Sequence, residues 1–148
     1  MNFIKKSFSI FLISIIPILN SNFTSADEKF FEAGVKFYKE KKFDKAQFMF
    51  EKSIVFNPKD SDSYLYLAKI FNEKEDQRKE EKNLEATLLI EPDNEEAILM
   101  LMKIALVKSN YSKVDNLSKT FSKVCKKLCD EKKGILETLA NIEPKNES

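Results

Sequence analysis

Apolar positions recur along this chain at the spacing of an α-helix, and the pattern returns every 34 residues. Within one stripe, small or apolar residues are spaced by three, one and three, which puts them on one face of a helix. The stripe is Phe30, Ala33, Gly34 and Phe37 in the first copy, Tyr64, Leu67, Ala68 and Phe71 in the second, and Ile98, Leu101, Met102 and Ala105 in the third. The repetition predicts three structural units of one kind.

A second helix follows the stripe in each unit. In the first two units it ends with a small residue, an apolar run, a polar residue and a proline, at 53–58 and 87–92. Asp60 and Asn94 then supply cap-type side chains where the next helix starts. We therefore predict helices near 28–40, 44–56, 62–74, 79–90, 95–108 and 112–128, in units spanning 27–60, 61–94 and 95–128. The third unit is degenerate, because Ser118 replaces a large residue and no proline ends the unit.

The second unit departs from the first at one packed position. Ala46 of the first unit corresponds to Glu80 in the second, inside the polar run 73–83. A carboxylate is costly in a tight apolar gap unless it is paired. We therefore expect the start of this helix to be shifted or frayed, with packing that begins at Leu84.

A final apolar stripe lies beyond the third unit. Its members are Ile135, Leu136, Leu139 and Ile142. Stacked repeats need a terminal element to cover the last apolar face. The segment 129–148 is accordingly interpreted as a capping helix followed by a tail.

A period of 34 residues with two helices per unit is typical of helical-repeat arrays, and the chain resembles the tetratricopeptide repeat (TPR) family. The match is fullest in the first unit, where Gly34, Ala46 and Pro58 stand at positions where the family has small or turn residues. The resemblance implies an all-α fold, a right-handed α-α superhelix of three helix pairs with a capping helix. It also implies that the protein holds another protein or a peptide.

In the resembling family, the first helices of successive units line a concave groove. The corresponding positions here are Phe31, Val35, Tyr38, Leu65, Lys69, Asn72, Leu99, Lys103 and Leu106. The lysine–asparagine clamp for a terminal carboxylate, found in one version of the family, is absent because Phe31 and Val35 stand in its place. We expect a mainly apolar groove with a two-lysine edge, suited to an apolar peptide that carries an acidic residue. The alternative is that Phe31, Val35 and Leu65 contact a neighbouring helix or a second copy, and that the lysines are simply hydrated.

Residues 1–26 have the three parts of a secretory signal peptide. Lys5 and Lys6 precede a twelve-residue apolar centre, and a small-residue end, 24–26, predicts cleavage after Ala26. The alternative, an uncleaved anchor, is disfavoured because a span needs roughly 20 apolar residues. We expect a bacterial protein that is periplasmic or secreted and has no stable membrane span after cleavage.

Composition excludes several classes of function. The chain of 148 residues has room for one domain, and its 25 lysines and arginines nearly balance 24 acids. This balance gives no electrostatic reason to expect nucleic acid. Histidine is absent, which removes the commonest general base and metal ligand together. We predict no enzymatic activity, no cofactor and no metal.

Cys125 and Cys129 are the only cysteines. Side-chain carbons four residues apart on a helix lie roughly 5–6 Å apart, whereas a disulfide requires about 3.5–4.5 Å. We predict a disulfide that pins the turn before the capping helix, with Cys125 still helical and Cys129 past the helix end. The alternatives are a redox pair, which favours two intervening residues, and a zinc site, which needs two further ligands.

Together these observations predict a TPR adaptor that binds a protein or peptide partner in the bacterial cell envelope. The alternative is a structural subunit that self-associates through the same face. Gel filtration separates the two, since the adaptor alone should be a monomer.

Overall fold

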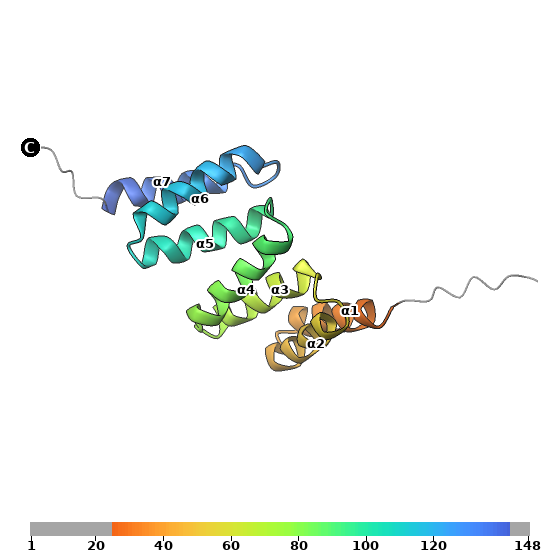
Figure 1. Ribbon diagram of the computed structural model, residues 1–148. Coiled ribbons are helices and arrows are strands. Elements are labelled where there is room, and N and C mark those ends of the chain that lie inside the picture. Colours follow the sequence, from red (N-terminus) through yellow and green to blue (C-terminus); the bar gives the residue numbers. More distant parts are fainter. Residues whose placement is uncertain (1–24, 143–148) are drawn as a thin grey trace, which may run out of the picture.

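The computed structural model describes residues 25–142, which form seven α-helices in sequence order (Figure 1). They are α1 (Ala26–Lys39), α2 (Phe43–Phe56), α3 (Ser61–Glu73), α4 (Gln77–Ile90), α5 (Glu95–Val107), α6 (Tyr111–Val124) and α7 (Glu131–Ile142). The described range contains no strand. The leader 1–26 lies outside these residues except for its last two positions, so the signal-peptide prediction is not tested.

The helices pack in consecutive pairs, and each pair stacks on the next. Figure 1 shows α1 and α2 at one end of an elongated stack and α6 and α7 at the other. The second helices α2, α4 and α6 begin 34 residues apart and have 14 residues each. The protein is therefore an all-α helical-repeat solenoid, as the sequence period predicts.

The turn inside each pair has the same backbone in all three units. Lys41, Glu75 and Ser109, spaced by 34, have positive φ values of 56°, 57° and 54°. The N–H of the following residue donates to a carbonyl five residues back, from Lys42 to Phe37 at 2.9 Å and equivalently in the other two turns. These bonds satisfy carbonyls at the end of the first helix. The tight turn therefore forms with residues other than glycine at its positive-φ position.

Helix α4 begins at Gln77, in register with α2 and α6, so the expectation of a shifted or frayed start is wrong. Asp76 caps the helix by accepting a hydrogen bond from the backbone N–H of Lys79 at 3.1 Å. Glu80 is buried, and the side-chain amide of Asn72 on α3 donates to its Oε1 at 3.1 Å. A capped helix end and a hydrogen-bonded carboxylate together keep the first turn in place.

The core consists of three clusters that follow one another along the stack. In the first cluster, the Phe50 ring stacks on Tyr66 of the next unit with 4.9 Å between centroids. Gly34 lies against Phe50 so closely that a Cβ there would be 2.6 Å from Cε1 of the ring. The second cluster joins α3 and α4 to α5, and the third joins α5 and α6 to α7.

Helix α7 covers the end of the stack. Ile135 is buried in the third cluster, and Leu139 packs beside it. Helix α7 contacts both α5 and α6, as a capping helix does. Among residues 25–142, none of the helices is long and apolar enough to span a bilayer.

Candidate functional site

A pocket of about 410 Å³ lies between the first helices of successive units. We call it the first-helix pocket. It is lined by Tyr38 of α1, by Lys69, Asn72 and Glu73 of α3, by Gln77 and Glu80 of α4, and by Glu96, Met100, Lys103, Ile104 and Val107 of α5. Its volume lies in the range of small-ligand pockets, roughly 300–1,000 Å³. The stacking of three first helices therefore creates a site that no single unit contains.

Four of the nine residues that the sequence placed in a groove line this pocket, namely Tyr38, Lys69, Asn72 and Lys103. The five apolar ones are in contacts between helices instead. Leu65 and Leu99 are buried in the second and third clusters, and Phe31, Val35 and Leu106 pack at the edges of clusters. The expectation of a mainly apolar groove is corrected accordingly. These five side chains pack between helices, so the pocket is lined by polar groups together with a smaller apolar part from α5.

Lys69 is bound within the protein. Its Nζ lies 2.8 Å from a carboxylate oxygen of Glu96 on α5 and 5.0 Å from the centroid of the Tyr66 ring. The ammonium therefore connects the second unit to the third. Lys103 is exposed on α5, and no ion pair joins it to another residue of 25–142. Of the two predicted lysines, only Lys103 remains available to a ligand.

Acids outnumber cations around the pocket. Glu73, Glu80 and Glu96 line it together with Lys69 and Lys103, which gives three negative groups against two positive ones when all are ionised. The pKa of Tyr38 is raised by burial and also by the carboxylates of Glu73 and Glu96. The two lysines that were expected to form a basic edge thus belong to a pocket in which acidic side chains outnumber basic ones.

Glu80 is the unusual group of this pocket. Its side chain is 5% exposed, although it carries a titratable carboxyl. Burial raises its pKa, the hydrogen bond from Asn72 opposes that rise, and the charge of Glu81 adds to it. The sequence singles out this position because a carboxylate replaces a small residue. It does not show that Asn72 lies within reach.

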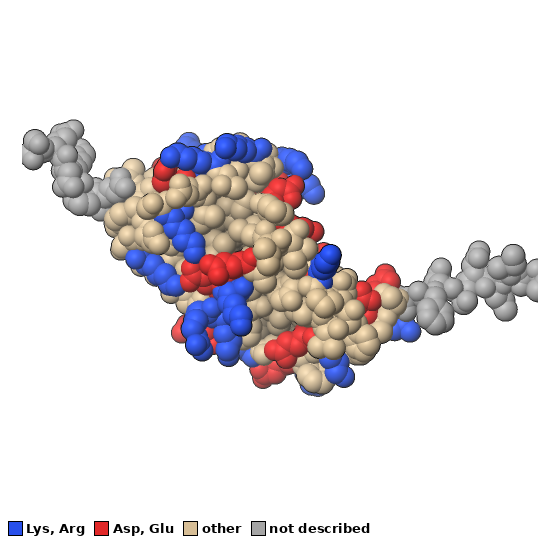
Figure 2. Space-filling model, viewed as in Figure 1, with Lys and Arg blue, Asp and Glu red and all other residues tan. Residues whose placement is uncertain are grey.

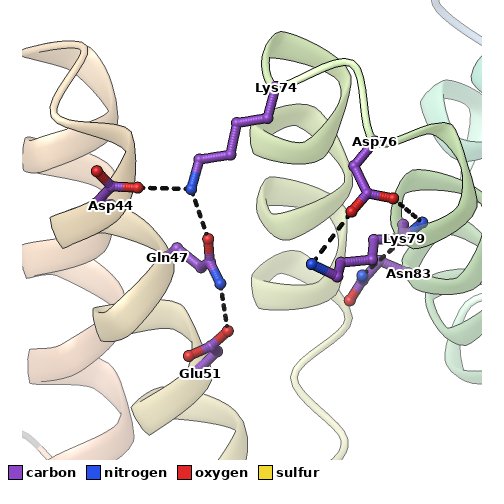
Figure 3. A network of polar contacts seen from close by, with 7 residues as sticks. All are labelled: Asp44, Gln47, Glu51, Lys74, Asp76, Lys79 and Asn83. Atoms are coloured by element: carbon purple, nitrogen blue, oxygen red, sulfur yellow. Dashed lines mark hydrogen bonds and ion pairs between the residues drawn. The ribbon is translucent and has the colours of Figure 1, made fainter.

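The polar contacts between units repeat with the helices. Lys74 at the end of α3 binds Asp44 at 2.7 Å and Gln47 at 2.8 Å, and Gln47 in turn binds Glu51 of the same helix (Figure 3). One unit later, Lys108 forms an ion pair with Glu81. Lys74 and Lys108 are 34 apart, as are Gln47 and Glu81. The repeat period contains this signal, which the sequence interpretation missed.

Cys125 and Cys129 are joined by a disulfide with their Cα atoms 5.3 Å apart. Helix α6 ends at Val124, earlier than the predicted 128, so Cys125 is the residue after the helix and not its last turn. Both cysteines lie in the connection between α6 and α7, where the backbone is not helical, so the spacing of helical residues does not apply. The bridge consequently forms without distorting a helix.

The loop enclosed by the disulfide binds a carboxylate of α5. Glu95 accepts backbone hydrogen bonds from Lys126 at 2.9 Å, Lys127 at 3.0 Å and Leu128 at 2.7 Å. The pKa of Glu95 is lowered by these bonds, that from Leu128 foremost, and by the charge of Lys126. The contact holds the loop against the first helix of the third unit.

Between residues 25 and 142 no group of three or more Cys, Asp or Glu side chains is arranged to hold a metal ion. On the face seen in Figure 2, basic and acidic side chains lie beside one another, and neither sign covers it. The first-helix pocket is the candidate site because three first helices and the buried carboxyl of Glu80 meet there.

No protein-family model matches the chain, and no curated protein matches it. Among solved structures, 33 chains match. One belongs to the structure titled "CopN-Scc3 complex" and has a TM-score of 0.65 and 17% sequence identity, over 85% of this chain and 82% of that one. At this identity the likeness concerns the fold, which is the same helical arrangement.

Proposed function

We propose that this protein is a TPR-type interaction scaffold that holds a segment of a partner protein in the first-helix pocket. One observation carries the proposal: three first helices jointly form an open pocket of ligand-binding size, with several polar side chains that are not needed for packing. The TPR resemblance and a structural neighbour whose title names a complex of two proteins support it. The function is binding without catalysis, in keeping with a chain that has no histidine.

We also propose that this scaffold works in the bacterial cell envelope. The proposal rests on the three-part leader at 1–26 and on a cysteine pair suited to an oxidising compartment. Expression of the full chain followed by fractionation and N-terminal sequencing tests it. A mature protein that starts at Asp27 in the periplasm is expected, and an unprocessed cytoplasmic chain would contradict the location.

The pocket is tested by affinity purification after crosslinking in the native envelope, with two matched variants. Val107 lines the pocket and Phe48 of α2 lies outside it, and both side chains are exposed, at 76% and 51%. The Val107→Lys variant is expected to lose the partner, while Phe48→Lys should recover it as the parent does. Circular dichroism must show both variants folded. Recovery by Val107→Lys at the parental level would overturn the proposed site.

A second function, self-association, is favoured by one separate observation. Val55, Phe56 and Leu89 are exposed at the ends of α2 and α4, at 76%, 60% and 85%. Val55 and Leu89 are 34 residues apart and occupy equivalent positions in neighbouring units, and exposed apolar patches mark interfaces. Light scattering on the mature chain decides this: a dimer that Leu89→Asp converts to a monomer would establish self-association here, and a parental monomer would reject it.

A further inference from the structure

Glu80 lies where the other two units have fully buried apolar residues. The equivalent positions are Ala46 in the first unit and Val114 in the third, both 0% exposed. A carboxylate at such a site reduces the stability of the fold unless its charge is paired. The repeat fold therefore does not require an acid at this position, because an apolar residue fills it in the other two units.

The carboxylate is only partly satisfied by its own chain. Asn72 donates to Oε1, whereas no residue of 25–142 donates a hydrogen bond to Oε2 or forms an ion pair with Glu80. Every fully sealed side-chain oxygen or nitrogen of these residues has a partner, so Oε2 still reaches the solvent of the pocket. The neighbouring charge that acts on it is that of Glu81, which has the same sign. The wall of the pocket thus contains a largely buried carboxylate, and one of its two oxygens receives no hydrogen bond from residues 25–142.

The surroundings favour a cation as the missing partner. Glu73 lines the same pocket, while Lys69 is already bound to Glu96. Of the pocket residues, Lys103 is the remaining cation, and the ionised groups sum to one negative charge. Removal of a charge from water is compensated best by an opposite charge that also donates hydrogen bonds.

We infer that the first-helix pocket receives a cationic side chain, the guanidinium or ammonium group of an arginine or lysine of the bound partner, with Glu80 as its counter-ion. The inference rests on the proposed function, since it names the chemistry that the scaffold recognises. The entering group donates to Oε2, while Asn72 keeps Oε1 oriented. Glu73 supplies a second acid at the pocket.

The inference is tested with a minimal probe, Nα-acetyl-arginine N-methylamide, titrated into the mature protein and followed by NMR at the Asn72 side-chain amide. The citrulline analogue is the neutral isostere. Saturable shifts are expected with the arginine probe, at least about tenfold weaker binding of the citrulline probe, and a similar loss in Glu80→Gln. The control Glu137→Gln removes one exposed acid from α7, outside the pocket, and should bind as the parent does.

Three results would overturn the inference: equal binding of both probes, full binding by Glu80→Gln, or no saturable shift with the arginine probe. Lys103→Met provides the internal check. If the ammonium of Lys103 were itself the counter-ion of Glu80, the probe would bind only after Lys103 had been removed. The inference instead expects the probe to bind the parent, and to bind the Lys103→Met variant more tightly.

The two proposals fail separately. If Val107→Lys abolishes partner recovery while Glu80→Gln leaves both recovery and probe binding unchanged, the scaffold proposal holds and the cation site is refuted. If the arginine probe binds through Glu80 but Val107→Lys leaves partner recovery unchanged, the cation site holds and the docking function is refuted.

Discussion

At the residue scale, Gly34 of α1 lies directly against the Phe50 ring of α2. An added Cβ would lie 2.6 Å, 2.8 Å and 2.9 Å from three carbons of the Phe50 ring. That ring is fully buried and stacks on Tyr66, so it has no free space into which to move. The glycine is therefore required by packing, and not by an unusual backbone conformation, since its φ is not positive.

We predict that Gly34→Ala lowers the free energy of unfolding. Overpacking costs about 1–3 kcal/mol, and the better helix propensity of alanine returns about 0.5–1 kcal/mol. The net loss should be about 1 kcal/mol in urea unfolding, and at most about 2.5 kcal/mol. Gly134→Ala on α7 is the matched control, because nothing lies within 4 Å of its Cβ. That variant should be neutral or more stable, and equal effects at the two sites would refute the packing argument.

Glu80→Gln should raise the stability of the protein at pH 7. Burial raises the pKa of this carboxyl above its usual value of 4.5, so the ionised form is disfavoured in the folded state. Below pH 4.5 the group is protonated in both states and the penalty vanishes; it develops as pH rises from 4.5 through the folded pKa. The advantage of the glutamine variant over the parent should therefore be present at pH 7 and shrink at pH 4.

Urea unfolding at both pH values measures this difference. Glutamine keeps an oxygen that can accept from Asn72, so the hydrogen bond is retained. Glu137→Gln serves as the control for loss of one acid, with a much smaller stability change expected at pH 7. An identical advantage of Glu80→Gln at pH 4 and pH 7 would show that charge burial is not its cause.

At the scale of elements, α2 lacks a cap that its two equivalents possess. Asp76 and Asn110 accept a hydrogen bond from the backbone N–H three residues on, whereas Lys42 at the same place in the first unit cannot. The backbone is already suited to a cap: φ and ψ are −87° and 64° at Lys42, and −89° and 72° at Asn110. The first unit lacks only a side chain that can accept the hydrogen bond.

Lys42→Asn should therefore stabilise the protein by about 0.5–2 kcal/mol. The ion pair of Lys42 with Glu40, which the substitution removes, is exposed and worth little. Thermal unfolding measures the gain. The reverse exchange, Asn110→Lys, should cost a comparable amount at α6, and a stable Asn110→Lys variant would show that these caps are unimportant.

The period of the sequence was sufficient to predict the helix pairs, their stacking and the capping helix, because an apolar stripe fixes which side of a helix is covered. The period did not predict which residues on the covered side are buried by the neighbouring unit and which stay exposed. Leu65 and Leu99 share a helix face with Lys69 and Lys103, yet the neighbouring unit buries the leucines and leaves Lys103 exposed. That outcome depends on the angle between successive units, which no single helix encodes.

The same limit explains the error at Glu80. A pattern of residue types marks a carboxylate in a packed position and predicts conflict. Partial relief of that conflict comes from Asn72, eight residues earlier on another helix, and from a pocket on whose wall both residues lie. Such a pairing depends on three-dimensional distance, so it becomes visible only in the structure.

At the scale of the whole molecule, stability depends on each unit covering the next. Ile135 is the buried residue of α7 in the third cluster. Ile135→Ala should cost roughly 2–4 kcal/mol, and hydrogen exchange should accelerate mainly in α5 to α7. Leu136→Ala, at a half-buried neighbour outside that cluster, is the control with a smaller expected effect. Equal acceleration in α1 and α2 would mean that the stack unfolds as one unit.

The contacts of Lys74 with Gln47 and of Lys108 with Glu81 occupy the same place in successive joints. Together with the similar turns at Lys41, Glu75 and Ser109, they give residues 61–94 the same kind of polar contact to the unit before and to the unit after. A second copy of this segment, inserted after the first, would present its own lysine to the Glu81 of the copy before it. Duplication within the gene could therefore lengthen such a protein while keeping this polar contact at the new joint, where only the apolar packing would have to adjust.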